Sequence, residues 1–325
     1  MNTTTTEIPN GFSIGTSAPS RMITYVVLQL CQLLSLPAYG FVGFHLLSSQ
    51  NLLQTLNNHA IIILLLINFI VLTVDLSFVL NFLRTGVTSP STNVTCIIWI
   101  FIDICMYNGS NLLMCWVSIE RHLLTFHANW LNTRKCRFFL HYLPLGCIIG
   151  YIFIYYIYVV FFYPCENSFN FTYAFCGYPC YALQPAPSLF NIETLVHQVA
   201  SCFVIGGFST ALLIRTLVRK CVRHQMIQWR RYKRMTLHLL SISFVYLVFN
   251  IPYAINPLGQ LINGSQPIND AIHINVFGYW AYGTCLLSPY AVLISVPNCW
   301  NKLRHLFFFR KRLIAPLLTN NPQFR

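Results

Sequence analysis

One predicted helical segment carries polar and bulky side chains at steps of three and four residues. The series consists of Asp103, Tyr107, Ser110, Met114, Val117 and Arg121. This spacing puts them on one face of a helix. Because a carboxylate inside a membrane is costly, we expect this face to point into a helical bundle. There Asp103 can form a strong pair with a charged group or accept an interhelical hydrogen bond, and both interpretations stay open.

The sequence contains no motif that is typical of an intramembrane enzyme. It lacks His-Glu-x-x-His and Gly-x-Gly-Asp, and its ten histidines do not follow metal-ligand spacing. We expect Asp75 and Asp103 at different depths of the bundle, which argues against a pair of catalytic carboxylates. The prediction is a protein that is not an enzyme and has neither a metal centre nor a cofactor.

The composition is typical of a membrane protein. Of the 325 residues, 56% are hydrophobic and 8% are charged, whereas soluble domains carry roughly 25% charged residues. Soluble enzymes, nucleic-acid-binding proteins and disordered scaffolds are disfavoured, despite the net charge of +13. We therefore expect lipids as partners and no nucleic acid.

Seven apolar segments are long enough to cross a bilayer as helices, which takes about 17 to 25 residues. They cover about 22–48, 57–83, 95–125, 137–163, 192–219, 234–262 and 270–297. Lipid offers backbone groups no partners, so the spans should be helical. We predict an all-α membrane protein with a seven-transmembrane-helix bundle at 22–297. It follows an extracellular tail at 1–21 and precedes a cytoplasmic segment, 298–325, that begins with a short amphipathic helix.

The basic residues predict the orientation of these spans. Eighteen of the 20 Lys and Arg lie in 121–137, in 215–234 and from 302 onward. These are alternate connections of a seven-span chain, so the positive-inside rule predicts an extracellular N-terminus and a cytoplasmic C-terminus. Four glycosylation sequons on the predicted outside support this orientation and a plasma-membrane location. They begin at Asn2, Asn93, Asn170 and Asn263.

Four of the 13 cysteines lie on the predicted outside. They are Cys96, Cys165, Cys176 and Cys180. In an oxidising compartment they can pair in three ways or stay free. Cys96 opens the third span, so a bond from it would hold the next outer loop over the mouth of the bundle. We read 169–184 as a hairpin that turns at Gly177-Tyr178-Pro179. The expected bonds are Cys96–Cys180 and Cys165–Cys176.

The third span resembles that of the rhodopsin-like G-protein-coupled receptors. Those receptors carry a Cys at the outer end of the third helix and an Asp/Glu-Arg-Tyr triplet at its inner end. Here Cys96 and Arg121 have the family's usual spacing, and the triplet is Glu120-Arg121-His122. Pro252 and Pro289 are similar to the kink-forming prolines of the sixth and seventh helices. The resemblance extends from about residue 22 to 312.

The resemblance implies a ligand site in the outer half of the bundle. In the amine receptors and some peptide receptors, a third-helix Asp binds the ligand's ammonium, and a seventh-helix Tyr hydrogen-bonds that Asp. Asp103 and Tyr282 match these two residues. Further residues would line the same cavity, or alternatively belong to the packed core: Tyr107, Tyr253, Asn256 and Tyr279.

The resemblance also implies a switch and an ion site. Glu120 would hold Arg121 at rest, and Arg121 would be released toward a G protein; an arginine that reaches the lipid headgroups is the alternative. Asp75 matches the family's buried second-helix Asp, which implies a sodium ion near Asp75 and Ser110. Ser288 stands where the family has an Asn of the seventh-helix motif, and this weakens the sodium site in principle.

The expected function follows from this resemblance. A divergent receptor would transmit an extracellular ligand, a cationic amine or peptide, to a heterotrimeric G protein by helix rearrangement. The sixth-helix Trp of the family is Asn250 here, and the seventh-helix Tyr is missing, so the usual activation relay is incomplete. The alternatives are a transporter or channel-like seven-helix protein and a receptor fold that does not couple to G proteins.

Overall fold

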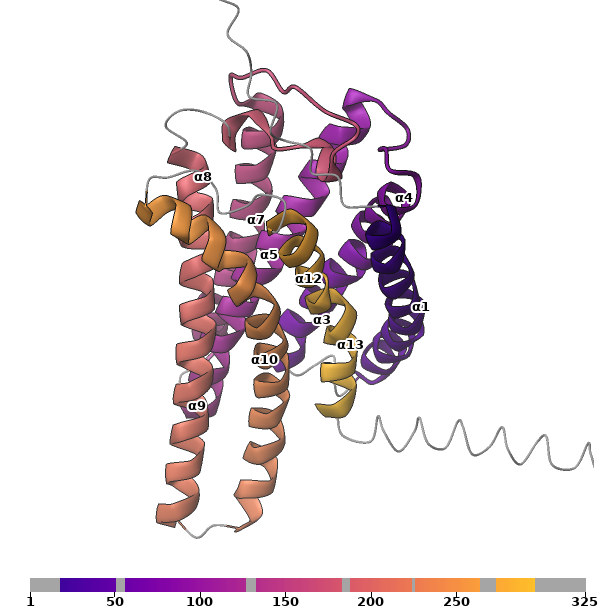
Figure 1. Cartoon of the computed structure of the whole chain (residues 1–325). Coiled ribbons are helices and arrows are strands. Elements are labelled where there is room, and N and C mark those ends of the chain that lie inside the picture. Colours follow the sequence, from indigo (N-terminus) through magenta and orange to yellow (C-terminus); the bar gives the residue numbers. More distant parts are fainter. Residues whose placement is uncertain are drawn as a thin grey trace, which may run out of the picture.

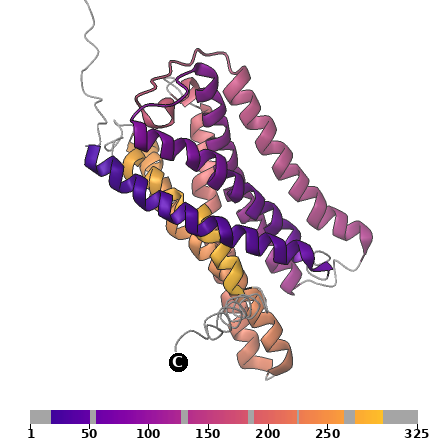
Figure 2. The ribbon, with the colours of Figure 1, turned by 90° about the vertical axis from the view of Figure 1, so that its right-hand side faces the viewer.

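The computed structural model describes residues 18–50, 56–126, 133–182, 188–223, 226–263 and 273–295. Within these residues every regular element is a helix (Figure 1; Figure 2). The all-helical prediction is therefore confirmed. The predicted amphipathic helix in 298–325 and most of the tail 1–21 lie outside the described residues, and the first helix already begins at Ala18.

The helices form long stretches, several of which pass from α-helical to π-helical geometry without a break (Figure 1). In chain order the stretches are α1 (Ala18–Ser48); α3 (Leu56–Ile70), η1 (Val71–Asp75) and α4 (Leu76–Thr85); α5 (Asn93–Phe126); α6 (Arg134–Arg137), η3 (Phe138–Tyr142), α7 (Leu143–Ile157) and η4 (Tyr158–Phe162); α8 (Ser188–Ile192), η7 (Glu193–Ala200) and α9 (Ser201–Arg223); α10 (Met226–Asn263); and η8 (His273–Gly278), α12 (Tyr279–Ala281) and α13 (Gly283–Ser295). Two short turns, η5 (Ala174–Cys176) and η6 (Cys180–Ala182), lie in the loop after η4.

Five of these stretches are long and apolar enough to cross a bilayer. They are Pro19–Ser48, Asn58–Thr85, Asn93–Phe126, Arg134–Phe162 and Leu189–Val218. Large apolar side chains face outward from them, and Phe203, for example, is 74% exposed. Such a surface suits lipid and not water. The protein is therefore a helical membrane protein. α10 contains a shorter apolar helix, Leu239–Ile255, and it and the η8–α13 stretch occupy the ranges predicted for the last two spans.

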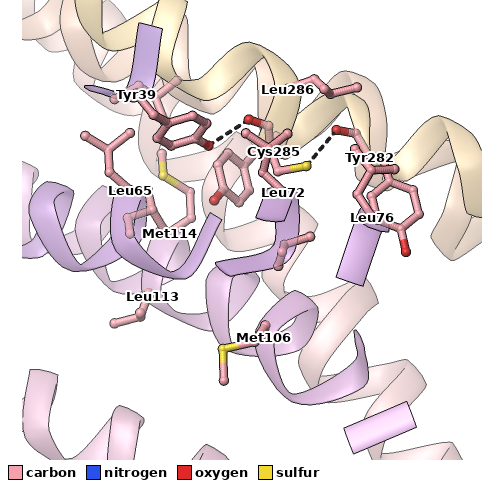
Figure 3. Close-up of a cluster of buried hydrophobic side chains, with 14 of the residues drawn as sticks. Tyr39, Leu65, Leu72, Leu76, Met106, Leu113, Met114, Tyr282, Cys285 and Leu286 are labelled. Atoms are coloured by element: carbon pink, nitrogen blue, oxygen red, sulfur yellow. Dashed lines mark hydrogen bonds between the residues drawn. The ribbon is translucent and has the colours of Figure 1, made fainter. Parts of the chain in front are cut away.

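α5 lies in the middle of the bundle, where it packs against α3, α7 and α9 and also contacts α10. Its Leu113 and Met114 are buried in one cluster with Leu72 and Leu76 of the preceding stretch (Figure 3). Because lipid is as apolar as these side chains, their close fit holds the helices together more than exclusion from water does.

Pro289 interrupts the backbone hydrogen bonds of α13, and side chains of α1 replace the missing bond. A proline has no N–H, so the carbonyl of Cys285, four residues earlier, has no partner within its own helix. The Tyr39 hydroxyl donates to this oxygen at 2.7 Å (Figure 3). The Ser35 hydroxyl donates to the neighbouring carbonyl of Leu286 at 2.8 Å. The predicted kink residue thereby ties α13 to α1.

Pro252 has the same effect in α10. It leaves the carbonyl of Val248 free, and the indole N–H of Trp280 donates to that oxygen at 3.2 Å. The helix bends in its outer part (Figure 1), as a missing backbone bond allows. Both predicted kink prolines therefore lie inside helices whose freed carbonyls are satisfied by a neighbouring element.

The loop after η4 pairs its cysteines differently from the prediction. The bonds are Cys96–Cys176 and Cys165–Cys180. The predicted pairs Cys96–Cys180 and Cys165–Cys176 are therefore wrong. We call the end of the bundle that carries these bonds the disulfide end.

The position of the turn explains the error. The chain reverses within 170–176, where the Asn170 N–H donates to the Cys176 carbonyl at 3.1 Å. Phe175 and Cys176 adopt positive φ angles of 57° and 56°, which close this turn before the predicted one at 177–179. Cys176 is thereby buried against the start of α5, and the following cysteine reaches Cys165 instead.

α9 and α10 are joined at the opposite end of the bundle. α9 ends at Arg223 and α10 begins at Met226, so the connection is short. The two helices extend side by side beyond the others (Figure 1; Figure 2). They carry most of the basic segment 215–234.

Gly283, at the start of α13, packs against an aromatic ring of α10. A Cβ atom there would lie 2.1 Å from Cε1 of Phe249, so Gly283→Ala forces the ring to move. We expect the unfolding free energy to fall by about 1–3 kcal/mol, the usual cost of overpacking. Gly207→Ala is the matched control, because no atom lies within 4 Å of its Cβ position. Thermal unfolding of both purified variants measures the difference, and equal losses would contradict this packing.

Candidate functional site

Three polar side chains, those of Trp99, Tyr282 and Asp103, meet around Asp75 near the disulfide end. The Trp99 indole N–H donates to Asp75 Oδ1 at 2.9 Å, and the Tyr282 hydroxyl donates to Asp75 Oδ2 at 2.6 Å. The Asp103 carboxyl lies close to that of Asp75. An ionised carboxylate can only accept a hydrogen bond, so a direct bond between the two carboxyl groups requires that one of them is protonated.

The turn between α4 and α5 explains why the two aspartates meet. Asp75 lies ten residues before the end of α4 at Thr85, and Asp103 lies ten residues after the start of α5 at Asn93. Antiparallel helices joined by a short connection bring residues equally far from it to the same depth. The prediction of different depths is therefore wrong, because Asp75 and Asp103 are equally far from the turn between α4 and α5.

The indole of Trp99 is held by aromatic neighbours. Its ring stacks on Phe78, with centroids 5.7 Å apart, and lies 5.3 Å from Phe175 of the disulfide-bonded loop. Trp99 and Asp75 are both fully buried. The loop thus rests on the residue that holds Asp75. Sequence reasoning missed Trp99, although it lies one helical turn before Asp103.

Tyr107 and Tyr253 lie together, one turn deeper than Asp103. Their rings make an edge contact with centroids 5.3 Å apart. The Tyr107 hydroxyl donates to Asn250 Oδ1 at 2.5 Å and is itself hydrogen-bonded by Asn111. Tyr253 is within electrostatic range of Asp103. Asn250, which stands where the family has a Trp, is therefore a polar partner of Tyr107.

A third carboxyl group, that of Glu193 in η7, faces α5 near the same end. Its Oε1 accepts from Asn108 Nδ2 at 2.9 Å, and its Oε2 accepts from the Tyr181 hydroxyl at 2.7 Å. Tyr156 of α7 is a third partner. Burial raises the pKa of Tyr181 well above its ordinary value, and the nearby Glu193 carboxylate raises it further. The phenol therefore stays protonated and remains a hydrogen-bond donor. Glu193 thus links three elements of the bundle.

His197 lies one turn after Glu193 and is fully buried. Its Nε2 pairs with the Tyr151 hydroxyl at 2.9 Å and its Nδ1 with the Tyr156 hydroxyl at 3.0 Å. These bonds attach η7 to α7. The sequence analysis predicted neither the burial of Glu193 nor the contacts of His197. Nothing in the local sequence indicates that η7 is a π-helix, and a π-helix rotates the residues that follow it.

Of the residues predicted to line the ligand site, one lies away from it and the side chain of another lies outside the described residues. Tyr279 is buried on α12 near Arg21 of α1. The side chain of Asn256 lies outside the described residues. Tyr282 belongs to the site, but its hydroxyl bonds Asp75 and not the predicted Asp103.

The residues predicted to form the sodium site lie in two separate places. Asp75 lies at the level of Asp103, whereas Ser110 is two helical turns deeper and donates to the Tyr107 carbonyl at 2.8 Å. Ser288 accepts from Asn68 Nδ2 at 3.3 Å, and the same nitrogen donates to Tyr246 at 2.9 Å. The expected grouping of Asp75 with Ser110 and Ser288 is therefore wrong. The error has the same cause as before, the depth assigned to Asp75.

At the opposite end of α5, Glu120 is hydrogen-bonded by Nδ1 of His141 in η3. His141 Nε2 in turn lies 3.3 Å from Nδ1 of His59 in α3. Glu120 and Arg121 are each only 3% exposed, and His122 packs between the rings of Phe126 and Phe208. The prediction gave Glu120 only Arg121 as a partner and missed His141, which lies about as far beyond the α5–α6 connection as Glu120 lies before it.

The predicted glycosylation sites are described in part. Asn93, the first residue of α5, is exposed, and so is Asn170. Asn170 Oδ1 accepts from the backbone N–H and the hydroxyl of Thr172, at 3.0 and 2.6 Å. Asn2 and the side chain of Asn263 lie outside the described residues.

The charged side chains that meet at the site are all carboxyl groups. Asp75, Asp103 and Glu193 interact with tyrosine, tryptophan and asparagine side chains and with one another. In the described part of the chain, no Lys or Arg is among the groups that act on these carboxyls. In a low-dielectric interior such a site attracts a cation. The described residues also contain no group of three or more His, Cys, Asp or Glu that could hold a metal ion.

Comparison with known proteins adds no family to these observations. No family model matches the chain, and no curated protein sequence matches it.

Proposed function

We propose that the protein is a seven-span receptor of the rhodopsin-like type that binds a cationic amine or peptide at the disulfide end and signals to a heterotrimeric G protein at the other. One observation carries this proposal: a single helix, α5, carries Asp103 and Tyr107 in its first half and Glu120 and Arg121 near its end. A ligand that favours one position of this helix changes the opposite end as well.

The ligand's charge is inferred from the three carboxyls, which have no Lys or Arg among their partners in the described residues. The faces of Tyr107 and Tyr253 offer the cation–π contacts that ammonium groups favour. Asp103 is the proposed anchor, because Asp75 is fully buried and already accepts from Trp99 and Tyr282.

The proposed orientation places the disulfide end outside the plasma membrane, where disulfides form and persist. The basic segments then lie in the cytoplasm, in agreement with the positive-inside rule, and glycans would be attached at Asn93 and Asn170. Burial of Arg121 favours a switch residue over one that reaches the headgroups. The extended ends of α9 and α10 are the proposed contact surface for the G protein.

A G-protein activation assay in cells tests the proposal. Amines and short basic peptides are applied to the parent and to Arg121→Ala, with surface expression measured for both. We expect a cationic ligand that activates the parent and a response at least about tenfold weaker in the variant, the equivalent of about 1.4 kcal/mol. A parent that binds such a ligand at the surface but activates no G protein would reject the proposal.

A proton-coupled transporter is the second candidate, and the proximity of the Asp75 and Asp103 carboxyls is the observation that favours it. Paired intramembrane carboxyls are typical of proton pathways in transporters. Uptake of a labelled cation that depends on a pH gradient, without G-protein activation, would favour this candidate over the receptor.

A further inference from the structure

The two disulfides that hold the loop between η4 and α8 differ in exposure. Cys96 and Cys176 are both fully buried, whereas Cys165 and Cys180 are half-buried. A thiol must reach one of the sulfur atoms to break the bond, so exposed disulfides are the ones that respond to reductants. We call Cys165–Cys180 the outer disulfide and Cys96–Cys176 the inner disulfide. A reductant is therefore expected to open the outer disulfide first.

The outer disulfide holds the part of the loop that contacts η7. Cys180 begins η6, and the hydroxyl of the next residue, Tyr181, donates to Glu193 Oε2 at 2.7 Å. Tyr181 is only 3% exposed, so the disulfide lies one residue away from a buried contact. The Cys180 N–H also donates to Asn167 Oδ1 at 2.8 Å. The short segment 165–167 therefore fixes where Tyr181 lies.

The middle of the loop has attachments of its own. The inner disulfide fixes it to the start of α5, and the Phe175 ring lies 5.3 Å from that of Trp99. The Thr88 N–H donates to the Phe171 carbonyl at 2.8 Å. Each of these contacts is independent of the outer disulfide. Opening the outer disulfide therefore releases the residues around η6 and leaves the middle of the loop in place.

The position of η7 depends on the hydrogen-bond partners of Glu193. Among the described residues these are Asn108 on α5, Tyr156 on α7 and Tyr181 of the loop. The outer disulfide controls the last of them, and a buried carboxyl that loses a donor is destabilised. Tyr156 also bonds His197 of η7 at 3.0 Å, so a shift of Glu193 affects a second contact. Because π-helical segments as long as η7 are rare, we expect η7 to need these contacts.

We infer that the outer disulfide is a thiol-sensitive latch: when a dithiol reduces it, Tyr181 releases Glu193 and η7 loosens from α5 and α7. This inference goes beyond the proposed function and rests on it only for the orientation, which puts the outer disulfide outside the cell, within reach of a secreted protein dithiol. It adds a regulatory site in the loop and needs neither a ligand nor a G protein.

The reduction is a two-step thiol–disulfide exchange. A thiolate of the dithiol attacks one sulfur of the outer disulfide, forms a mixed disulfide with it and displaces the other cysteine as a thiolate. The second thiolate of the reductant then attacks its partner sulfur in the mixed disulfide and displaces the first cysteine. The dithiol leaves as a disulfide, two electrons pass to the protein, and two protons end on the thiols of Cys165 and Cys180. An oxidised dithiol reverses both steps and closes the latch.

Hydrogen exchange of the purified full-length protein in lipid nanodiscs tests this inference. Free cysteines are blocked with N-ethylmaleimide, dithiothreitol is added in increasing concentration, and mass spectrometry of peptides shows which disulfide has opened. We expect the outer disulfide to open at a concentration that leaves the inner one intact. At that concentration the amides of 193–200 should exchange at least about tenfold faster, because a buried carboxyl has lost a donor. Exchange of 170–176 should stay unchanged.

Tyr181→Phe separates the latch from a general loosening of the loop. It removes the hydroxyl and keeps the outer disulfide, so 193–200 should exchange faster before any dithiol is added and gain less than about twofold on reduction. Tyr163→Phe is the matched control, because Tyr163 lies in the same loop and its ring packs on Tyr158, with centroids 6.3 Å apart. This control should respond to dithiothreitol as the parent does.

The double variant Cys165→Ser, Cys180→Ser imitates the open latch, so its exchange at 193–200 should be as fast as that of the reduced parent. An outer disulfide that resists dithiothreitol, or that opens together with the inner one, would overturn the inference. Unchanged exchange at 193–200 after selective reduction, or a Tyr181→Phe variant that still gains about tenfold, would overturn it as well. Failure of the receptor proposal looks different: the latch responds in the exchange measurement, but no G protein is activated.

Discussion

Asp103→Asn should reach the cell surface and respond to a cationic ligand at least about 100-fold more weakly than the parent. Loss of a buried charged partner costs about 2–5 kcal/mol in binding, and about 2.7 kcal/mol corresponds to 100-fold. Asparagine keeps the size of the side chain and can still hydrogen-bond Asp75, so the bundle should fold. The measurement is the ligand concentration for half-maximal G-protein activation, at equal surface expression.

Glu166→Gln is the matched control for this variant. It removes the same charge from an exposed position in the loop after η4, where solvent and salt screen it. We expect its potency to stay within about threefold of the parent. An unchanged response of Asp103→Asn would assign that carboxyl to the structural pair with Asp75 and deny it a ligand role.

Glu120→Gln and His141→Phe should each lower the unfolding free energy by about 3 kcal/mol. Each substitution removes one partner of a buried hydrogen-bonded pair and leaves the other group without it. Glu120 belongs to α5 and His141 to η3, so the loss also loosens the contact between these elements. Reversible unfolding in mixed detergent micelles measures the effect.

The double variant shows whether the two residues act as a pair. Its loss should be smaller than the sum of the two single losses by at least about 1 kcal/mol, because the same interaction is counted in both. His59→Phe is the comparison: it removes only the weaker 3.3 Å contact to His141 and should cost no more than about 1 kcal/mol. Additive losses of Glu120→Gln and His141→Phe would contradict the pairing.

Distances along the chain carried more information about the site than the positions of residues within single spans did. Asp75 and Asp103 meet because each lies ten residues from the short turn that joins their helices. Counting from that turn would have placed them together, whereas the family resemblance placed Asp75 with Ser110. The same counting from the α5–α6 connection finds His141 opposite Glu120.

Other contacts could not be obtained by such counting. Glu193 meets Asn108, and Tyr282 meets Asp75, across elements that are far apart in the sequence. π-Helical segments end at Asp75 and begin at Glu193, and each changes the direction of the side chains that follow it. Sequence periodicity assumes a constant turn and therefore misdirects residues at these places.

The sequence by itself determined that this chain is a helical membrane protein and where most of its helices lie, because hydropathy, prolines and charged loops act locally and need no partner. Only the tertiary structure decided which cysteines pair, which tyrosine holds Asp75, and that Glu193 is buried. These contacts depend on the positive-φ turn at Phe175 and Cys176, on π-helical register and on helix packing. Each of these is set by the fit between distant segments, which a single sequence does not contain.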